Sequence, residues 1–189
     1  MRLSNQKEVD LSSYDNSWYI QGRSLIIRIT WYFVNILFFK SSFSVLSYIK
    51  VELLKIFGAK VGHGVVIKPC VNIKYPWNLE IGDNVWIGEN VWIDNLSMII
   101  IKNNACISQG AMLLCGNHNY KLKSFDLIVR PIVIEDGAWV GAQSLVCPGV
   151  TLKSHSVLSV CSVATKDLDA YTIYRGNPAQ KISERTIHD

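Results

Sequence analysis

From position 61 onward, aliphatic residues recur along the chain at every sixth position. A period of six fits neither the face of an α-helix, which repeats about every 3.6 residues, nor the alternation of a single strand. It predicts very short strands joined by tight bends, with one side chain of each strand pointing toward a central axis. The series runs through Val61, Ile67, Ile73, Leu79, Ile81, Ile87, Ile93, Ile99, Ile101, Ile107, Leu113, Ile134, Val140, Val146, Leu152 and Leu158.

Two slips interrupt this register, from Leu79 to Ile81 and from Ile99 to Ile101. They predict a corner enlarged by two residues at the same place in successive coils. Three hexapeptides make a triangular coil of about 18 residues, and stacked coils bury a continuous apolar column. The predicted fold class is therefore all-β, a parallel β-helix of hexapeptide repeats. An ordinary β-sandwich with chance periodicity is the alternative.

Two positions of each repeat carry small residues. Small or β-branched residues stand four places after most of the aliphatic positions, where they are expected to fill the corners of the column. Glycine follows several aliphatic positions directly, and we expect it to use its freedom in φ at the bends. These glycines are Gly62, Gly82, Gly88 and Gly141.

The first 60 residues follow a different pattern. Residues 1–17 are polar and are expected to lack fixed structure, residues 24–39 predict a helix that is apolar almost all round, and residues 44–57 predict a second helix that stops at Gly58. The apolar run 25–39 is interrupted by Arg28 and Asn35 and is shorter than the roughly 20 residues of a spanning helix. The predicted organisation is a tail with two helices (1–60), a β-helix (61–182) and a C-terminal tail (183–189).

The net charge of +4 is placed unevenly. Residues 1–60 contain eight Lys or Arg against four Asp or Glu, whereas residues 61–189 contain eleven of each. A β-helix without net charge has no field that attracts nucleic acid, so no nucleic-acid partner is expected. A basic and apolar N-terminal segment is consistent with two roles, contact with an anionic membrane surface or capping of the open end of the β-helix.

Cysteine usage bears on the cellular compartment. The chain has five cysteines, an odd number, and none of them forms a CxxC pair. This argues against a disulfide framework or a zinc ribbon and favours a reducing compartment. We expect all five to be small buried hydrophobic residues, and the protein to be cytoplasmic, with membrane association open.

His118 is the candidate catalytic residue among the four histidines. It lies in the long break of the repeat, where residues of about 116–131 must project from the column as a loop. A neutral imidazole near pH 7 suits general-base catalysis, although an ordinary loop histidine is the alternative. His63 and His155 fall at bends and are expected to be solvated. Because no H-x₃₋₅-H pair exists, no metal site is expected.

Asp94 and Asn95 lie about one coil before Gly116, so stacking is expected to bring them near His118. The alternative is a solvated corner. Three tryptophans share a place immediately before an inner aliphatic residue, from which the side chain points outward. Outward tryptophans are costly in a monomer, which indicates a subunit interface or a ligand platform. They are Trp86, Trp92 and Trp139.

Several segments together resemble the hexapeptide-repeat acetyltransferases of the colanic-acid-biosynthesis type, and more distantly the galactoside and maltose acetyltransferases. The resemblance implies a left-handed β-helix, a homotrimer, acetyl-CoA as the donor and a sugar hydroxyl as the acceptor. The handedness rests on this resemblance alone, since the general crossover rule favours right-handed connections. The similar segments are 76–95 (PWNLEIGDNVWIGENVWIDN), 106–111 (CISQGA), 116–120 (GNHNY), 137–142 (GAWVGA), 163–168 (VATKDL) and 176–179 (GNPA).

The same resemblance assigns roles to individual residues. It places the catalytic base at His118. The acceptor contacts that it implies are Asp94, Asn95, Asn117, Tyr120 and Trp139. The acetyl-CoA contacts that it implies are Gly141, Ala142, Val160, Thr165, Lys166, Gln180 and Lys181. The chain departs from the family pattern at 102–104 (KNN) and 153–155 (KSH), where the family usually has turns that contain Gly. It also lacks the arginine that the family often has near position 180.

The sequence thus predicts an acetyl-CoA-dependent O-acetyltransferase that acts on a sugar or polysaccharide precursor, as in exopolysaccharide biosynthesis, with a histidine general base and without a metal. Alternatives are the same fold acylating an amino sugar or serine, or using a longer acyl donor, and a non-catalytic β-helical scaffold.

Overall fold

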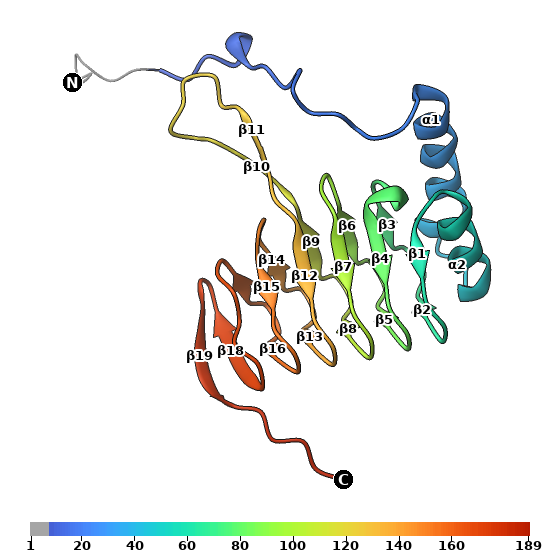
Figure 1. Cartoon of the computed structure of the whole chain (residues 1–189), viewed down its shortest axis with the longest axis vertical. Helices are drawn as coiled ribbons and strands as arrows, with labels where there is room; N and C mark the ends of the chain where they lie inside the picture. The colour runs from blue at the N-terminus through green and yellow to red at the C-terminus, as the bar shows by residue number, and fades with distance from the viewer. Residues whose placement is uncertain (1–7) are drawn as a thin grey trace.

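The structure is a computed structural model that describes residues 8–189. Its body is a solenoid whose coils each contribute one short strand to each of three parallel sheets, as Figure 1 shows. The five coils are β1–β3, β4–β6, β7–β9, β12–β14 and β15–β17. The prediction of a left-handed parallel β-helix with an N-terminal helical segment is confirmed.

The strands are two to six residues long. Sheet A consists of β1 (Lys60–Val61), β4 (Leu79–Ile81), β7 (Ile99–Ile101), β12 (Ile132–Ile134) and β15 (Thr151–Leu152). Sheet B consists of the parallel strands β2 (Val66–Ile67), β5 (Trp86–Ile87), β8 (Cys106–Ile107), β13 (Trp139–Val140), β16 (Val157–Leu158) and β18 (Thr172–Gly176), and β19 (Ala179–Glu184) pairs antiparallel with β18 at its end. Sheet C consists of β3 (Asn72–Ile73), β6 (Trp92–Asp94), β9 (Met112–Leu114), β14 (Leu145–Val146) and β17 (Val163–Ala164).

The core is the predicted apolar column. Of the aliphatic residues in the six-residue series, all are buried except Val61, which is half-buried at the first coil. The register of sheet A reproduces the predicted enlarged corner, because Lys60 pairs with Glu80 and Glu80 with Ile100. The next step is longer, from Ile100 to Val133, because a hairpin is inserted there.

The glycines that follow the aliphatic positions do not have the positive φ that was expected of them at the bends. Residues with φ of +55° to +85° stand three places after most inner aliphatic positions, as at Asn84, Asn90 and Gln143. Gly88 and Gly141 are not among them. A Cβ at Gly88 would lie 2.5 Å from the backbone nitrogen of Gln109 in the next coil. These glycines are therefore required by the close stacking of the coils and not by positive φ.

Two helices cover the open end of the first coil. They are α1 (Leu25–Val34), which continues into a π-helical turn (Asn35–Phe39), and α2 (Ser47–Ile56). The Trp31 indole donates a hydrogen bond to the Ile73 carbonyl (2.9 Å). The fully buried Lys50 donates to the carbonyls of Ile67 (3.2 Å) and Lys68 (2.8 Å), and burial lowers the pKa of this lysine. These bonds satisfy edge groups that no coil faces.

The N-terminal segment departs from the expected disordered tail. Its described part, residues 8–24, crosses the tip of the projecting hairpin and then runs back to α1 (Figure 1). It contains a short 3-10 helix, Leu11–Ser13, and the Asp10 amide donates to the Lys123 carbonyl (2.9 Å). Residues 1–7, also expected to lack fixed structure, lie outside the described residues.

Two further features complete the described chain. The cysteines are all unpaired, but only Cys115 is buried and Cys161 is exposed, which corrects the expectation of five buried thiols. Within residues 8–189, no helix combines the length and the apolarity needed to cross a bilayer.

Candidate active site

His118 lies on a hairpin that leaves the solenoid after sheet C. Its strands are β10 (Gly116–His118) and β11 (Leu127–Val129), which pair antiparallel with His118 opposite Leu127. The hairpin projects from the corner where the chain would otherwise pass from β9 to β12 (Figure 1). A rigid two-stranded stem thus positions the histidine near the surface of the solenoid.

The imidazole of His118 is held in one orientation by its neighbours. Its Nδ1 lies 2.8 Å from the carbonyl oxygen of Phe125, and its ring stacks on the Phe125 ring with centroids 4.6 Å apart. The Tyr14 ring lies 5.8 Å away at a tilt of 52°. Because a carbonyl oxygen only accepts hydrogen bonds, Nδ1 carries the hydrogen, and Nε2 is the nitrogen left to accept a proton.

A pocket of about 440 Å³ adjoins this ring. Three parts of the chain form it: the N-terminal segment, the corners that follow β3 and β6, and the base of the hairpin. Its lining includes three of the predicted site residues, Asp94, Asn117 and His118. The other lining residues are Tyr14, Asn16, Tyr19, Gln21, Lys74, Tyr75, Leu96, Gly116 and Leu127.

Polar contacts fix the walls of this pocket. Asp94 ends β6 and forms an ion pair with Lys74 (2.9 Å), so its carboxylate is held in place. The hydroxyl of Tyr19 donates to the Leu96 carbonyl (2.7 Å). Burial, with smaller contributions from Tyr75 and Asp94, raises the pKa of Tyr19, so this phenol stays neutral at physiological pH. The Asn117 side chain accepts a hydrogen bond from the His118 amide (2.8 Å).

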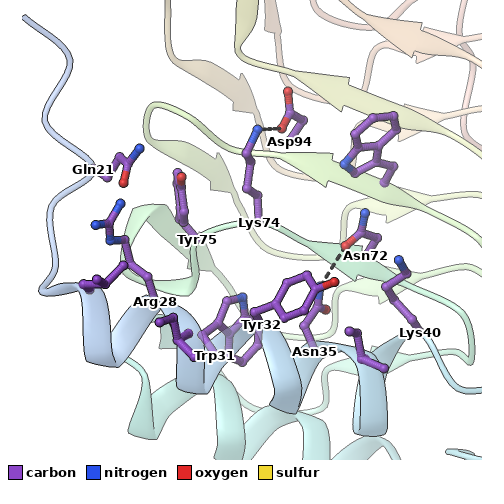
Figure 2. A pocket seen from close by; sticks show the side chains of 14 residues that line it. Gln21, Arg28, Trp31, Tyr32, Asn35, Lys40, Asn72, Lys74, Tyr75 and Asp94 are labelled. Carbon is purple, nitrogen blue, oxygen red and sulfur yellow. Dashed lines mark hydrogen bonds and ion pairs between the residues drawn. The ribbon is translucent and has the colours of Figure 1, made fainter. Parts of the chain in front are cut away.

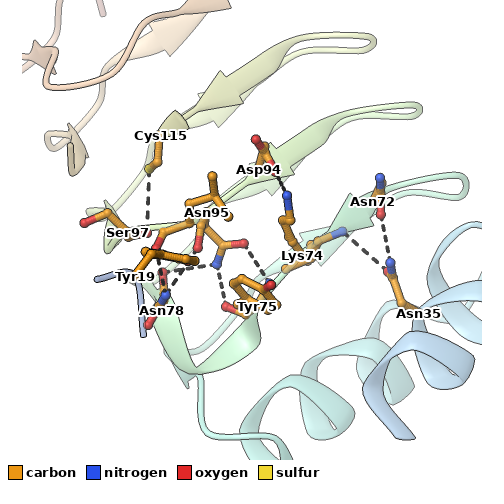
Figure 3. A network of polar contacts seen from close by, with 12 residues as sticks. Tyr19, Asn35, Asn72, Lys74, Tyr75, Asn78, Asp94, Asn95, Ser97 and Cys115 are labelled. Atoms are coloured by element: carbon orange, nitrogen blue, oxygen red, sulfur yellow. Dashed lines mark hydrogen bonds and ion pairs between the residues drawn. The ribbon is translucent and has the colours of Figure 1, made fainter. Parts of the chain in front are cut away.

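Asn95, predicted to contact the acceptor, has a structural position. Its side chain is fully buried within a network of backbone groups (Figure 3). The Asn95 amide accepts from the Tyr75 N–H (2.9 Å) and donates to the carbonyls of Tyr75 (2.5 Å) and Asn78 (3.1 Å). The enlarged corner, with its 3-10 helix Pro76–Asn78, is therefore closed by this side chain, which has no surface left for a ligand.

Tyr120 and Trp139 do not line the His118 pocket. Tyr120 lies at the hairpin tip and is 71% exposed. Trp139 stands on the outer face of sheet B, where its indole donates to the Ser108 hydroxyl (2.8 Å). Trp86 and Trp92 are also exposed, as predicted from their place in the repeat. Within one chain, therefore, Trp139 does not lie beside His118.

The predicted acetyl-CoA residues fall into three groups. Gly141 and Ala142 form the bend after β13. Val160 stacks on this bend from the next coil, where the Cys161 amide donates to the Ala142 carbonyl (2.9 Å). Thr165 and Lys166 follow β17 and are exposed. Gln180 and Lys181 lie on β19, and Lys181 is paired with Glu184. None of the seven lines the His118 pocket.

The pocket also contains residues that sequence reasoning missed. Tyr14, Tyr19 and Lys74 line it but are separated by long stretches of chain from the hairpin. The only signal in the sequence was the concentration of aromatic residues in an otherwise polar N-terminal segment.

Thiol nucleophiles and metal ions are the two other kinds of chemistry that bear on the region around His118. Cys115 adjoins the hairpin, but burial raises the pKa of its thiol to about 11, so it is a poor nucleophile at neutral pH. In the part of the chain that the structure describes, no group of three His, Cys, Asp or Glu side chains is arranged to hold a metal ion. His155 is half-buried and stacks on Tyr171 (4.7 Å), so its expected solvated position is corrected.

Comparisons with known proteins identify relatives. No family model matches the chain. It is 38% identical over 176 residues to the putative colanic acid biosynthesis acetyltransferase WcaF of Escherichia coli K12, covering 93% of this chain and 97% of that protein. It is 30% identical over 141 residues to the galactoside O-acetyltransferase of the same organism, covering 73% of this chain and 70% of that protein.

Solved structures share the fold. A hexapeptide-repeat acetyltransferase of Vibrio cholerae complexed with acetyl-CoA gives a TM-score of 0.77 at 22% identity, covering 86% of this chain and 88% of that chain. A galactoside acetyltransferase in complex with coenzyme A gives 0.74 at 25% identity, covering 85% of this chain and 82% of that chain. With a relative at 38% identity along nearly its whole length, this protein belongs to the hexapeptide-repeat acetyltransferases of the colanic-acid-biosynthesis type and is an acyltransferase.

Proposed function

We propose that this acetyltransferase moves the acetyl group of acetyl-CoA to a hydroxyl of a saccharide, with His118 as the general base. The observation that carries the proposal is the hydrogen bond between His118 Nδ1 and the Phe125 carbonyl, which leaves Nε2 as the proton acceptor beside a pocket. The names of the sugar acetyltransferases to which the chain is similar support a saccharide acceptor.

The chemistry follows from the neutral imidazole. Nε2 of His118 takes the proton of the acceptor hydroxyl as its oxygen attacks the thioester carbonyl. The resulting tetrahedral oxyanion requires donors, and backbone amides of the Gly141–Ala142 bend are our candidates. When the C–S bond breaks, the imidazolium returns its proton to the departing CoA thiolate, and an acetyl ester remains. Because a thioester is already activated, a metal is not needed for this sequence.

Asp94 is our candidate acceptor contact. Its carboxylate lines the same pocket as His118 and is oriented by Lys74. A carboxylate fixed in this way accepts hydrogen bonds from sugar hydroxyls and so orients the reactive one toward Nε2. Asn117 remains a second candidate in this pocket, whereas Tyr120 has support only from the family resemblance.

The arrangement favours a homotrimer with active sites between subunits. His118 projects from the corner after sheet C, whereas Trp139 lies on sheet B and the Gly141–Ala142 bend lies at the corner between sheets B and C. A second copy is required to bring these two halves together. The exposed Trp86 and Trp139 on the outer face of sheet B provide an apolar surface for such a contact, whereas Trp92 on sheet C lies beside α1.

The transferase proposal is tested by incubating the protein with acetyl-CoA and a panel of mono- and oligosaccharides that includes amino sugars. We expect release of CoA thiol that depends on the acceptor, and an added acetyl group on a hydroxyl by mass spectrometry. Acetylation at nitrogen would replace the O-acetyltransferase by an N-acetyltransferase. Thiol release with no acceptor in the panel above the hydrolysis background would count against saccharides as the acceptor class.

The shared active site is tested with mixed subunits. His118→Ala removes the base, and Val160→Glu places a charge at an exposed position (58%) of the proposed CoA groove. Each variant alone is expected to be inactive. Co-expressed, they are expected to form mixed trimers that regain up to about a quarter of wild-type activity, since some interfaces then join an intact half from each chain. No recovery in mixed trimers would place both halves in one chain.

We also propose a cytoplasmic location with peripheral membrane contact through the N-terminal helices. Five unpaired thiols fit a reducing compartment. The outer side of α1 exposes Ile26 and Phe33, and the turn after it exposes Phe43 at 92%. The excess of basic residues in positions 1–60 complements an anionic bilayer surface.

A further inference from the structure

A second pocket of about 440 Å³ lies between α1 and the outer face of sheet C (Figure 2). Its floor is formed by Trp31 and Asn35 of the helical segment, and its opposite wall by Asn72, Trp92 and Asp94 of β3 and β6. The Asn35 amide donates to the Asn72 side chain (2.8 Å), which fixes the spacing of helix and sheet. The pocket is therefore a formed cleft within one chain.

Cations outnumber anions among the charged residues that line this cleft. It contains Arg28, Lys40 and Lys74, and Asp94 is its one acidic residue. Asp94 is paired with Lys74 (2.9 Å). Neither Arg28 nor Lys40 has a carboxylate within ion-pair distance among residues 8–189, and the buried Nε of Arg28 has no hydrogen-bond partner. The cleft therefore has a net positive charge that no carboxylate of the described chain compensates.

The cleft is continuous with the pocket of His118. Gln21, Lys74, Tyr75 and Asp94 line both. Figure 2 shows Arg28 at the end of the cleft beside Gln21 and Tyr75, whereas Lys40 lies at the other end, beside Asn72. Arg28 and Lys40 are twelve residue steps apart on the helical segment, roughly 18 Å along its axis, so a single anion does not contact both. An anion held by Arg28 lies at the end that leads to His118.

We propose that this cleft binds a phosphate or diphosphate ester that belongs to the acceptor, with Arg28 as the principal contact, so that the attached sugar reaches His118. The guanidinium group offers paired N–H donors that match phosphate oxygens. Leu25, Ile29 and Ile36 line the same cleft and give it an apolar flank. This inference rests on the proposed transferase and names its substrate class, a sugar carried on a phosphate.

Binding of inorganic pyrophosphate, measured by titration calorimetry, tests the subsite directly. Saturating CoA is present, so that the groove for the diphosphate of CoA itself is filled. We expect Arg28→Gln to weaken pyrophosphate binding by about tenfold or more, and Arg28→Lys, which keeps the charge but lacks the paired N–H donors, to give an intermediate loss. Lys40→Gln, at the far end, is expected to have a smaller effect. Lys55→Gln is the matched control for net charge, because Lys55 lies on α2 outside the cleft, and it is expected to bind as the wild type does.

Pyrophosphate binding that is absent from the wild type at millimolar concentration, or unchanged in Arg28→Gln, would overturn the subsite. So would preferential binding of glucuronate, which would identify a carboxylate site. Two further probes distinguish the source of the phosphate. Tighter binding of farnesyl diphosphate than of uridine diphosphate would support a lipid carrier, and the reverse order would support a nucleotide carrier.

The failure of this inference is distinguishable from failure of the transferase. Thiol release from acetyl-CoA reports the transferase without reference to Arg28. Arg28-dependent pyrophosphate binding without acetyl transfer would leave the subsite in place and remove the proposed reaction. If wild type and Arg28→Gln acetylate phosphorylated sugars with the same KM, and this KM equals that for the free sugars, the subsite is contradicted while the transferase stands.

Discussion

At the scale of single residues, two different requirements select the residues at the bends of the solenoid, a positive φ and space for the backbone of the next coil. Gly88 and Asn90 belong to the same bend but meet different demands. Asn90 has φ of +58°, which asparagine tolerates better than most residues, whereas the missing side chain of Gly88 admits the backbone of the next coil. The sequence shows glycine at position 88 but not which of these two reasons applies, because the clash arises only between stacked coils.

We therefore expect Gly88→Ala to destabilise the protein by about 1–3 kcal/mol, since the added Cβ would lie 2.5 Å from the Gln109 nitrogen and backbone must shift. Asn90→Gly, in the same bend, keeps the positive φ accessible and is expected to cost less than about 1 kcal/mol. Denaturant unfolding at a fixed protein concentration measures both. Equal losses in the two variants would contradict the stacking explanation.

At the scale of elements, the helical segment acts as a cap on an otherwise open sheet edge. Trp31 is 2% exposed and contacts the rings of Phe39 and Phe57 while its indole reaches the Ile73 carbonyl. Lys50 likewise donates a hydrogen bond to the Ile67 carbonyl at the edge of β2. A β-helix has no neighbouring coil at its ends, so side-chain donors from another element must replace the missing strand.

Trp31→Phe is expected to reduce the free energy of unfolding by about 1–3 kcal/mol, because a buried carbonyl loses its donor. Tyr32→Phe is the matched control. Tyr32 is the next residue on the same helix, is 61% exposed and is expected to leave stability unchanged. Chemical denaturation with both variants checks the cap. A wild-type unfolding midpoint for Trp31→Phe would show that the indole hydrogen bond does not contribute.

The elements also show how far the sequence determines the structure. The six-residue period was sufficient to predict the strands and the enlarged corner, since each coil repeats the same local demands. The break in that period was sufficient to predict a projecting loop with His118. The position of Tyr14 and Tyr19 over the pocket was not predictable, because it depends on contacts with residues far along the chain and follows no period. The Phe125 carbonyl was missed for a similar reason, since a backbone group has no signature in the sequence.

At the scale of the whole molecule, charge and apolar surface are concentrated at one end. The helices that cap the first coil carry many of the exposed apolar side chains, and residues 24–60 contain five Lys or Arg against one Glu, a net charge of +4. Basic residues near an anionic bilayer contribute about 1 kcal/mol of attraction each. The pockets of Arg28 and His118 adjoin this end, so an acceptor held at a membrane would be within reach of both.

We expect the full chain to sediment with phosphatidylglycerol vesicles at low salt and to be released as salt is raised. The double variant Phe33→Glu, Leu37→Glu is expected to stay in the supernatant, because it places charges on the exposed side of the helical segment. Ile187→Glu, an exposed position in the C-terminal tail, is the matched control. Wild-type protein that remains in the supernatant at low salt would exclude the membrane contact.

The most direct measurement of the central claim is the turnover of acetyl-CoA by His118→Ala, followed as released CoA thiol in the presence of an acceptor. We predict that kcat falls by about 10²–10⁴, the contribution of a general base, while acetyl-CoA affinity is retained. His63→Ala, at an exposed bend outside the pocket, is predicted to turn over as the wild type does. A kcat near the wild-type value in His118→Ala would contradict the account.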